Sequence, residues 1–251
     1  EENGFGFSAD ELLERITPAT RLIILNSPAN PTGGVTPADE IDKLVRGLEK
    51  WPDVAILSDE IYGQMTYDRL EHRSLLTYPQ LRERVILLDG WSKTYAMTGW
   101  RLGYSVWPEA LADHVRKLAV NCHSCVNASA QYAGIAALEG PQDCVKEMVS
   151  AFDRRRAFVA ERMNEIEGIR CAVPKGAFYA FPNISGTGWN ERDLASALLE
   201  EAGVATIAGT DFGAHGKGFI RISCANSQEN IAAAIDRIDS FLAQNKARRA
   251  G

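Results

Sequence analysis

Three short apolar runs in the first half of the chain constrain its fold most strongly. Each holds four consecutive apolar residues and ends in polar or turn-forming residues; the runs are 22–25, 54–57 and 85–88. Continuous apolar runs of this length are typical of buried strands, and the long connections between them suit crossovers between parallel strands. The pattern predicts an α/β fold built on a mainly parallel sheet, with helices on both faces.

A helix and a fourth strand are expected in the same half. Pro37 opens a helical stretch that runs to about Lys50, and Thr36 is its predicted N-cap. Residues 102–106 form a further short apolar segment that ends at Trp107-Pro108, and we expect a strand there. The helix has four apolar residues at helical spacing: Ile41, Leu44, Val45 and Leu48.

The second half of the chain has a different, α+β pattern. A long amphipathic helix is predicted from Pro141 to about Ile166, and two later helices over 191–201 and 228–245. We therefore place a domain boundary within the long helix near residue 150, which gives domains 1–150 and 151–251. Short strands are expected near 169–173, 178–181, 204–207 and 219–223.

Composition excludes several classes of protein. The 251 residues include 27 basic and 33 acidic residues, so the net charge of −6 argues against a nucleic-acid partner. No apolar run approaches the roughly 18 residues that a membrane span needs, so no membrane partner is expected. Five cysteines suit a reducing compartment, and we expect a cytoplasmic protein with ordinary buried thiols. Cys122 and Cys125 have the spacing of half a zinc site or of a redox pair, but no second Cys/His pair and no thioredoxin-like context follow, so no metal is predicted.

Chemically diverse residues follow the three apolar runs. Asn30 lies in the turn after the first run, Asp59 and Tyr62 follow the second, and Ser92 and Lys93 follow the third. Each has a simple structural interpretation, as a turn former, a cap or a solvated loop residue. Ligands bind beyond the carboxyl ends of strands in open parallel sheets, however, and all these residues fall there. Their joint occurrence predicts a binding site.

Four segments of the chain resemble signatures of one family. Residues 92–104 (SKTYAMTGWRLGY) are similar to the lysine motif of class I/II aminotransferases, which are pyridoxal-phosphate-dependent enzymes of fold type I. Three further segments match in the same order: 30–33 (NPTG), 58–62 (SDEIY) and 219–223 (FIRIS). The resemblance covers essentially the whole chain. It implies an aspartate aminotransferase-like fold, with a large cofactor-binding domain over 1–150 and a smaller C-terminal domain over 151–251.

The resemblance assigns a role to each residue around the cofactor ring. Lys93 would form a Schiff base with pyridoxal 5'-phosphate, because a partly buried amine is neutral and nucleophilic. The freed amine would then act as general acid and base at the substrate α-carbon. Asp59 would keep the pyridine nitrogen protonated, so that the ring remains an electron sink. Tyr62 and Asn30 would hydrogen-bond the phenolic oxygen of the ring.

Two further groups follow from the same resemblance. Ser92 and Arg101 would hold the cofactor phosphate, since arginine recognises paired oxygens well. Arg221, with Asn30, would bind the α-carboxylate of the substrate. An inter-strand salt bridge is the structural alternative for Arg221, because a lone arginine in an apolar strand needs an anionic partner.

The start of the chain differs from the family pattern. Family members carry a longer N-terminal portion with a glycine-rich phosphate turn, and this chain begins at Glu1. We expect that the N-terminal portion is missing and that residues 1–251 alone bind the cofactor weakly and turn over poorly. The resemblance also implies a homodimer, in which a partner tyrosine reaches the phosphate.

The predicted function is transamination between an L-amino acid and a 2-oxo acid through a Lys93 Schiff base. Two alternatives stay open at this point. One is a pyridoxal-phosphate-dependent C–S lyase of the same fold, and the other is the aminotransferase-like sensor domain of certain transcription regulators. The substrate is also open: aspartate, an aromatic amino acid or a broad set all fit the motifs.

Overall fold

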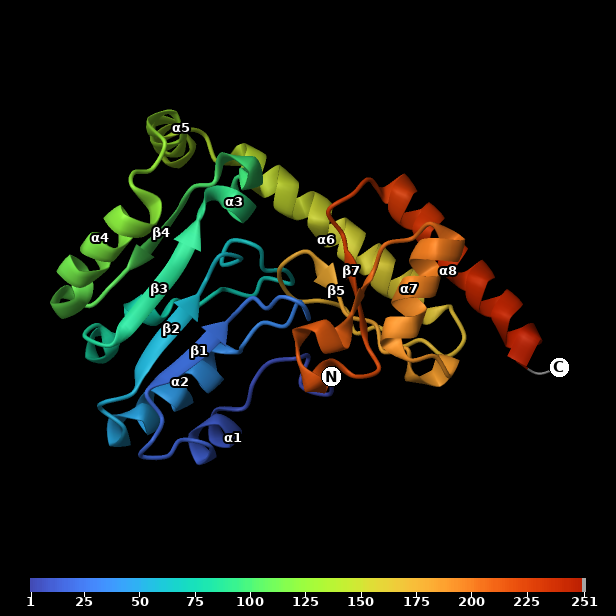
Figure 1. Cartoon of the computed structure of the whole chain (residues 1–251), viewed down its shortest axis with the longest axis horizontal. Helices are drawn as coiled ribbons and strands as arrows, with labels where there is room; N and C mark the ends of the chain where they lie inside the picture. The colour runs from blue at the N-terminus through green and yellow to red at the C-terminus, as the bar shows by residue number, and fades with distance from the viewer. Residues whose placement is uncertain (250–251) are drawn as a thin grey trace. The chain divides into compact units, whose positions relative to one another are not determined.

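The computed structural model describes the backbone of residues 1–249 and the side chains of residues 1–245, and it contains two compact units (Figure 1). We call them the four-stranded unit and the three-stranded unit, after their sheets. The four-stranded unit comprises residues 5–28 and 35–149. The three-stranded unit comprises residues 1–4 and 29–34 together with the chain from 150 onward. The last boundary lies inside helix α6 (Asp143–Asn164).

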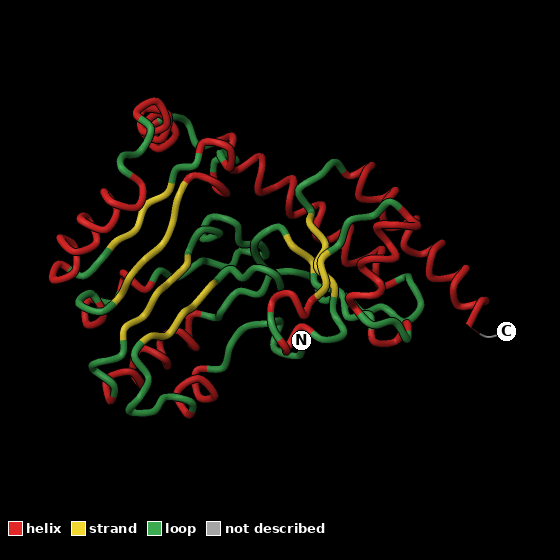
Figure 2. Tube along the Cα trace, viewed as in Figure 1, coloured by secondary structure: helices red, strands yellow, loops and turns green. Residues whose placement is uncertain are grey.

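The sheet of the four-stranded unit has the order β1-β2-β3-β4 (Figure 2). The first three strands are parallel, which confirms the predicted mainly parallel sheet, and β4 pairs antiparallel with β3. The register of the parallel strands places their carboxyl ends next to one another: Asn26 pairs with Asp59, and Asp59 pairs with Leu88. The strands are β1 (Leu22–Asn26), β2 (Ala55–Asp59), β3 (Val85–Gly90) and β4 (Gly103–Val106).

Two helices cover one face of this sheet near β1. Helices α1 (Ala9–Glu14) and α2 (Ala38–Gly47) share one core with Ile23 and Leu25 of β1. On the opposite face of the same strand, Leu22 is 44% exposed and Ile24 is 68% exposed. Side chains alternate between the faces of a strand, so within the described residues helices cover one face of β1 and leave the other exposed.

The predicted cap of α2 is wrong. The N-cap residue is Pro37, which makes no side-chain capping bond. Thr36 instead donates its backbone N–H to Ser27 Oγ at 3.0 Å. The proline ring fixes an extended approach to the helix, and Thr36 is left one residue too early to cap it.

Three helices lie in a stretch for which the sequence predicted none. They are α3 (Trp91–Thr94), α4 (Glu109–His123) and α5 (Ala128–Glu139). Helix α4 buries no residue, and α5 buries only Ala130 and Gly134. Helix α5 has no helical period of apolar residues, whereas α4 has one at Leu111, Val115 and Leu118 that the sequence interpretation missed. The short 3₁₀ helices of the four-stranded unit are Leu48–Lys50, Leu75–Thr77, Pro79–Leu81 and Thr98–Trp100.

The three-stranded unit has the α+β architecture that the sequence predicted. Its antiparallel sheet has the order β5-β7-β6, with the strands β5 (Tyr179–Ala180), β6 (Ile207–Ala208) and β7 (Ile220–Ser223). Helices α7 (Glu191–Ala202) and α8 (Gln228–Arg249) accompany the later part of α6. Its 3₁₀ helices are Ser185–Thr187, Gly209–Phe212 and Ala214–Gly216.

The strand expected near 169–173 does not form. Arg170 makes only an isolated bridge with Asn183. The side chain of Asn164 bonds both backbone groups of Cys171, the residue after Arg170. Its Oδ1 accepts from Cys171 N at 2.9 Å, and its Nδ2 donates to Cys171 O at 2.8 Å. Backbone groups bonded to a side chain cannot extend a ladder.

All five cysteines are free, but the expectation that they are buried holds for only two. Cys171 and Cys224 are buried, whereas Cys122, Cys125 and Cys144 are exposed. Cys122 belongs to α4, a helix with no buried residue. No helix in the described part of the chain combines the length and apolar character that crossing a membrane would require.

Candidate active site

The carboxyl ends of β1, β2 and β3 lie side by side, because these strands are parallel and in register. Asp59 is the last residue of β2. Asn26, the last residue of β1, donates from Nδ2 to the backbone oxygen of Asp59 at 3.3 Å. Asn26 was not among the predicted site residues, and only the strand register reveals its position beside Asp59.

Asp59 is a half-buried carboxylate among other carboxylates. Its Oδ1 accepts a hydrogen bond from Ile61 N at 3.2 Å. Burial raises the pKa of Asp59, and the charges of Asp89 and Glu60 raise that pKa further. A carboxylate in such surroundings is stabilised by any cation that comes to lie against it.

Asp89, on the neighbouring strand β3, was missed by the sequence interpretation. It accepts hydrogen bonds from Gly90 N at 2.6 Å and from the Tyr104 hydroxyl at 2.9 Å. Burial raises the pKa of Asp89 in spite of these bonds. Burial and the bond to Asp89 raise the pKa of Tyr104 to about 12. Tyr104 therefore stays protonated and donates a hydrogen bond that keeps Asp89 in place.

Lys93 and Tyr62 belong to the same unit as Asp59. Lys93 lies in α3, which begins directly after β3. Its Nζ is 5.8 Å from the centroid of the Tyr62 ring, and Tyr62 is only 3% exposed. The four-stranded unit thus brings together a carboxylate, a phenol and an amine, as the argument from strand ends predicts.

A pair of glycines lets the chain approach itself at the start of this lysine segment. A Cβ on Gly90 would lie 2.7 Å from Gly103 Cα and 3.0 Å from Leu102 O. Gly90 and Gly103 face one another across β3 and β4. This close approach accompanies the hydrogen bond from Trp91 N to Leu102 O at 3.3 Å, at the point where α3 begins.

The two predicted phosphate ligands have different surroundings. Arg101 has a left-handed backbone (φ 54°), donates to Thr98 O at 2.8 Å and is exposed. It lines an open pocket of about 1040 Å³ together with Arg116, His123 and the residues around the start of α5. Ser92 is partly buried and is not among the residues that line this pocket.

Arg221 and Asn30 form a second group, within the three-stranded unit. Nη1 of Arg221 donates to Asn30 Oδ1 at 2.8 Å. The guanidinium carbon is 4.5 Å from the ring centroid of Tyr179 and 4.9 Å from that of Phe212. Arg221 makes no ion pair with a carboxylate in the described part of the chain, so the salt-bridge alternative is not seen. Its charge is held by an amide and two rings, which suits recognition of an anion.

The loop that carries Asn30 is closed on itself and fixed to a second segment. Ala29 N donates to Gly34 O at 2.8 Å, and Gly33 N donates to Ala29 O at 2.9 Å. Gly33 O in turn accepts from Lys175 N and Gly176 N, at 2.9 and 2.8 Å. These bonds fix the position from which Asn30 reaches Arg221.

Substitution of Gly33 by alanine is expected to lower the free energy of unfolding by about 2–4 kcal/mol. Gly33 has a φ of +69°, and a Cβ there would lie 2.6 Å from Pro174 Cβ and 2.7 Å from Tyr179 O. The matched control is Gly203→Ala, because Gly203 has a similar φ of +63° and only an ordinary contact at 3.5 Å. Urea unfolding of both variants measures the difference. Equal losses would show that the close packing of Gly33 contributes nothing.

The chain belongs to the aminotransferase class I and II family, whose model matches residues 1–238. It is 40% identical over 248 residues to an aspartate aminotransferase of Pyrococcus horikoshii, covering 98% of this chain and 63% of that protein. It is 38% identical over 248 residues to aromatic-amino-acid aminotransferase 2 of Thermococcus litoralis, with the same coverage of 98% and 63%. The chain thus spans 63% of the length of these curated relatives.

Solved structures give the same result. An aromatic aminotransferase from Pyrococcus horikoshii superposes with a TM-score of 0.93 at 37% identity, over 98% of this chain and 66% of that one. The aspartate aminotransferase from Rhizobium meliloti gives 0.90 at 36% identity, over 96% and 62%. The predicted family and fold class are confirmed. Members of this family are pyridoxal-phosphate-dependent enzymes.

The residues of the four-stranded unit fit this cofactor. Asp59 has neighbouring negative charges and a raised pKa, so a protonated ring nitrogen would supply the cation that its surroundings lack. The Lys93 amine, beside the buried ring of Tyr62, is of the type that would attach this cofactor covalently. The donor set therefore has the chemistry that the cofactor needs.

Proposed function

We propose that the protein is a pyridoxal-phosphate-dependent transaminase that moves an amino group between an L-amino acid and a 2-oxo acid. The observation that carries this proposal is the Lys93 amine, which shares a unit with the buried Tyr62 ring and the carboxylate-flanked Asp59. The relatives named above are aminotransferases, which favours this function over a lyase or a sensor domain.

Each predicted site residue of the four-stranded unit has a proposed role. The cofactor supplies an electron-withdrawing ring that stabilises negative charge at the substrate α-carbon. Lys93 would hold the cofactor through its amine, and the same amine would take and return the α-proton of the substrate. Asp59 holds a proton on the ring nitrogen by its charge, and Tyr62 donates a hydrogen bond to the ring oxygen. Ser92 and Arg101 bind the phosphate, to which arginine offers paired donors.

Substrate recognition is proposed for the three-stranded unit. Arg221 and Asn30 bind the α-carboxylate, to which a guanidinium donates two parallel hydrogen bonds. The Tyr179 and Phe212 rings restrict the guanidinium, so less side-chain entropy is lost when the carboxylate binds. Aspartate and aromatic amino acids are the first substrates to test, since the relatives carry both names.

Exposed apolar side chains and free cysteines bear on the assembly and the location of the protein. Large apolar side chains are exposed on α4 and α5, with Leu118 at 65% and Tyr132 at 76%. Exposed apolar surface of this kind supports a homodimer. Five free cysteines support a cytoplasmic location. We also propose that residues 1–150 bind the cofactor and that residues 151–251 form the smaller domain.

Borohydride trapping tests the proposed function. The protein mixed with pyridoxal phosphate should develop a visible absorbance band that added amino acid shifts. Reduction should fix the cofactor on one peptide, and mass spectrometry should place it on Lys93. A cofactor fixed on another lysine, or none at all, would contradict the proposal. Keto-acid formation that depends on a 2-oxo acid acceptor distinguishes transamination from a lyase reaction.

A further inference from the structure

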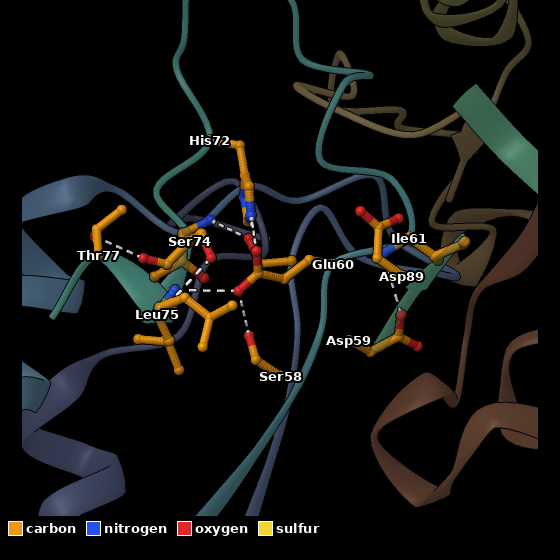
Figure 3. A network of polar contacts seen from close by, with 12 residues as sticks. Ser58, Asp59, Glu60, Ile61, His72, Ser74, Leu75, Thr77 and Asp89 are labelled. Atoms are coloured by element: carbon orange, nitrogen blue, oxygen red, sulfur yellow. Dashed lines mark hydrogen bonds and ion pairs between the residues drawn. The ribbon is translucent and has the colours of Figure 1, made fainter. Parts of the chain in front are cut away.

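A buried carboxylate lies directly after Asp59 and is not used by the chemistry proposed above. The side chain of Glu60 is only 6% exposed. Its Oε1 accepts from Ser58 Oγ at 2.8 Å and from Leu75 N at 3.1 Å, and its Oε2 lies 2.9 Å from His72 Nε2 (Figure 3). Both carboxylate oxygens are therefore bonded, and their partners come from two parts of the chain, the end of β2 and the segment 72–75.

These bonds keep Glu60 ionised in a buried place. Burial by itself raises the pKa of Glu60, but bonds from His72, Ser74 and Ser58 and the charge of His72 outweigh it, so the pKa is lowered. A buried carboxylate that loses its partner is costly, because its charge is no longer compensated. The His72 side chain is 15% exposed, so water has little access to replace it.

The bond between Ser58 and Glu60 spans Asp59. Successive side chains of a strand point to opposite sides, so Ser58 and Glu60 point one way and Asp59 the other. Figure 3 shows Asp59 on the side of the strand away from His72 and Leu75. As long as Glu60 is held by His72 and Ser58, the backbone of Asp59 cannot rotate without breaking these bonds.

The same residue also fixes the turn that leads to Tyr62. Glu60 N donates to Leu88 O at 2.9 Å, and Glu60 O accepts from Gly63 N at 2.7 Å. A Cβ on Gly63 would meet His72 Cδ2 at 3.0 Å, so the imidazole packs closely on this turn. Asp59 and Tyr62, the two ring-binding residues of the segment, therefore lie on either side of one anchored residue.

We propose that the buried Glu60–His72 pair, bonded to Ser58, is the positioning element that holds Asp59 and Tyr62 in their cofactor-binding orientation. This inference rests on the proposed function. Glu60 and His72 act through their neighbours: Glu60 through the backbone of Asp59 and the turn to Tyr62, and His72 through Glu60. Loss of either residue is expected to lower the affinity for the cofactor by more than a general loss of stability with the same drop in melting temperature would.

Two substitutions of His72 test the pair. His72→Leu leaves Glu60 without its partner, and we expect at least a 10-fold weaker affinity for pyridoxal phosphate. His72→Gln can still donate to Oε2 of Glu60, and we expect affinity within about 3-fold of the original protein. Affinity is measured by quenching of tryptophan emission during cofactor titration, which needs no turnover. The bound cofactor's visible band should be broadened or shifted in His72→Leu and restored in His72→Gln.

Arg84→Met is the matched control for a general loss of stability. Arg84 donates to the carbonyl oxygens of Trp51, Val54 and Leu48, and it directly precedes β3, at the end opposite to Asp89. Its loss should lower the melting temperature while cofactor affinity stays within 3-fold. If His72→Leu and Arg84→Met lose the same affinity for the same drop in melting temperature, the proposed positioning role is wrong.

A milder variant keeps the test decisive if His72→Leu does not fold. Ser58→Ala removes only the hydroxyl that bonds Glu60 across Asp59, and we expect a 3- to 10-fold loss of cofactor affinity. Unchanged affinity in Ser58→Ala would then overturn the inference. A failure of the proposed function looks different, since the unsubstituted protein itself would bind no cofactor at Lys93.

Discussion

Replacement of Lys93 by alanine is expected to lower the rate of amino-group transfer by at least about 10⁴-fold. Proton transfer by a positioned side chain alone contributes roughly 10²- to 10⁴-fold, and this variant also loses the covalent attachment point. The measurement is the rate of keto-acid formation from aspartate or phenylalanine with a 2-oxo acid acceptor. Borohydride should then fix no cofactor on the peptide that contains residue 93.

The control for this substitution is an exposed lysine that lies outside the proposed site. Lys146 bonds only to Asp143, and both side chains are 76% exposed. Lys146→Ala should keep the full rate and the trapped cofactor. If Lys93→Ala kept either of them, a different amine would have to carry the chemistry. The stability of Lys93→Ala should change little, which separates a catalytic loss from unfolding.

Asp59→Asn is expected to change activity and stability in opposite directions. The amide cannot hold a proton on the ring nitrogen by charge, and we expect a loss of about 10²- to 10³-fold in rate, as for loss of one preorganised electrostatic group. The pKa of Asp59 is raised in the folded state, so ionisation of this carboxyl opposes folding above its ordinary pKa of 3.8. The neutral amide removes that cost, and the cofactor-free variant should melt at a higher temperature.

A pH titration of the cofactor-free protein provides a separate check on Asp59, with its carboxyl carbon followed by NMR. Because its pKa is raised, the ionised form is lost as pH falls through a value above 3.8. Asp89→Asn removes one of the charges that raise this pKa, so the titration of Asp59 should move to lower pH. The amide oxygen can still accept from Gly90 N, and the amide N–H₂ then faces the Tyr104 hydroxyl, which can accept. Asp42→Asn, which removes a carboxylate paired with Arg73, should leave the titration of Asp59 in place.

The central residues of the four-stranded unit could be predicted because a general rule applies to them. Polar residues after parallel apolar strands gather at one edge, so Asp59, Tyr62 and Lys93 could be placed without coordinates. Asn26 could not, because its bond to Asp59 depends on the register of β1 against β2. The same holds for Asp89, which resembles an ordinary strand-end residue until its neighbours are known.

Other features depend on contacts that no local pattern contains. Asn30 and Arg221 are 191 residues apart, and their hydrogen bond exists only in the folded three-stranded unit. His72 lies in an irregular connection, so nothing in the sequence links it to Glu60. Asn164 replaces a predicted strand by bonding the backbone of Cys171, a competition that strand propensity does not include. Helix α5 has no helical period of apolar residues, so periodicity does not reveal it, whereas the apolar period of α4 was present in the sequence and was missed.

The loop over residues 29–34 has a consequence for any exchange of parts with a relative. It lies between β1 and α2 along the chain, yet its contacts belong to the three-stranded unit. A chimera that took only residues 150–251 from another family member would keep this chain's loop and replace its partners. The bonds of Gly33 O with residues 175 and 176, and of Asn30 with residue 221, would then join sequences that did not evolve together. Exchanging the C-terminal segment therefore means moving residues 29–34 together with it.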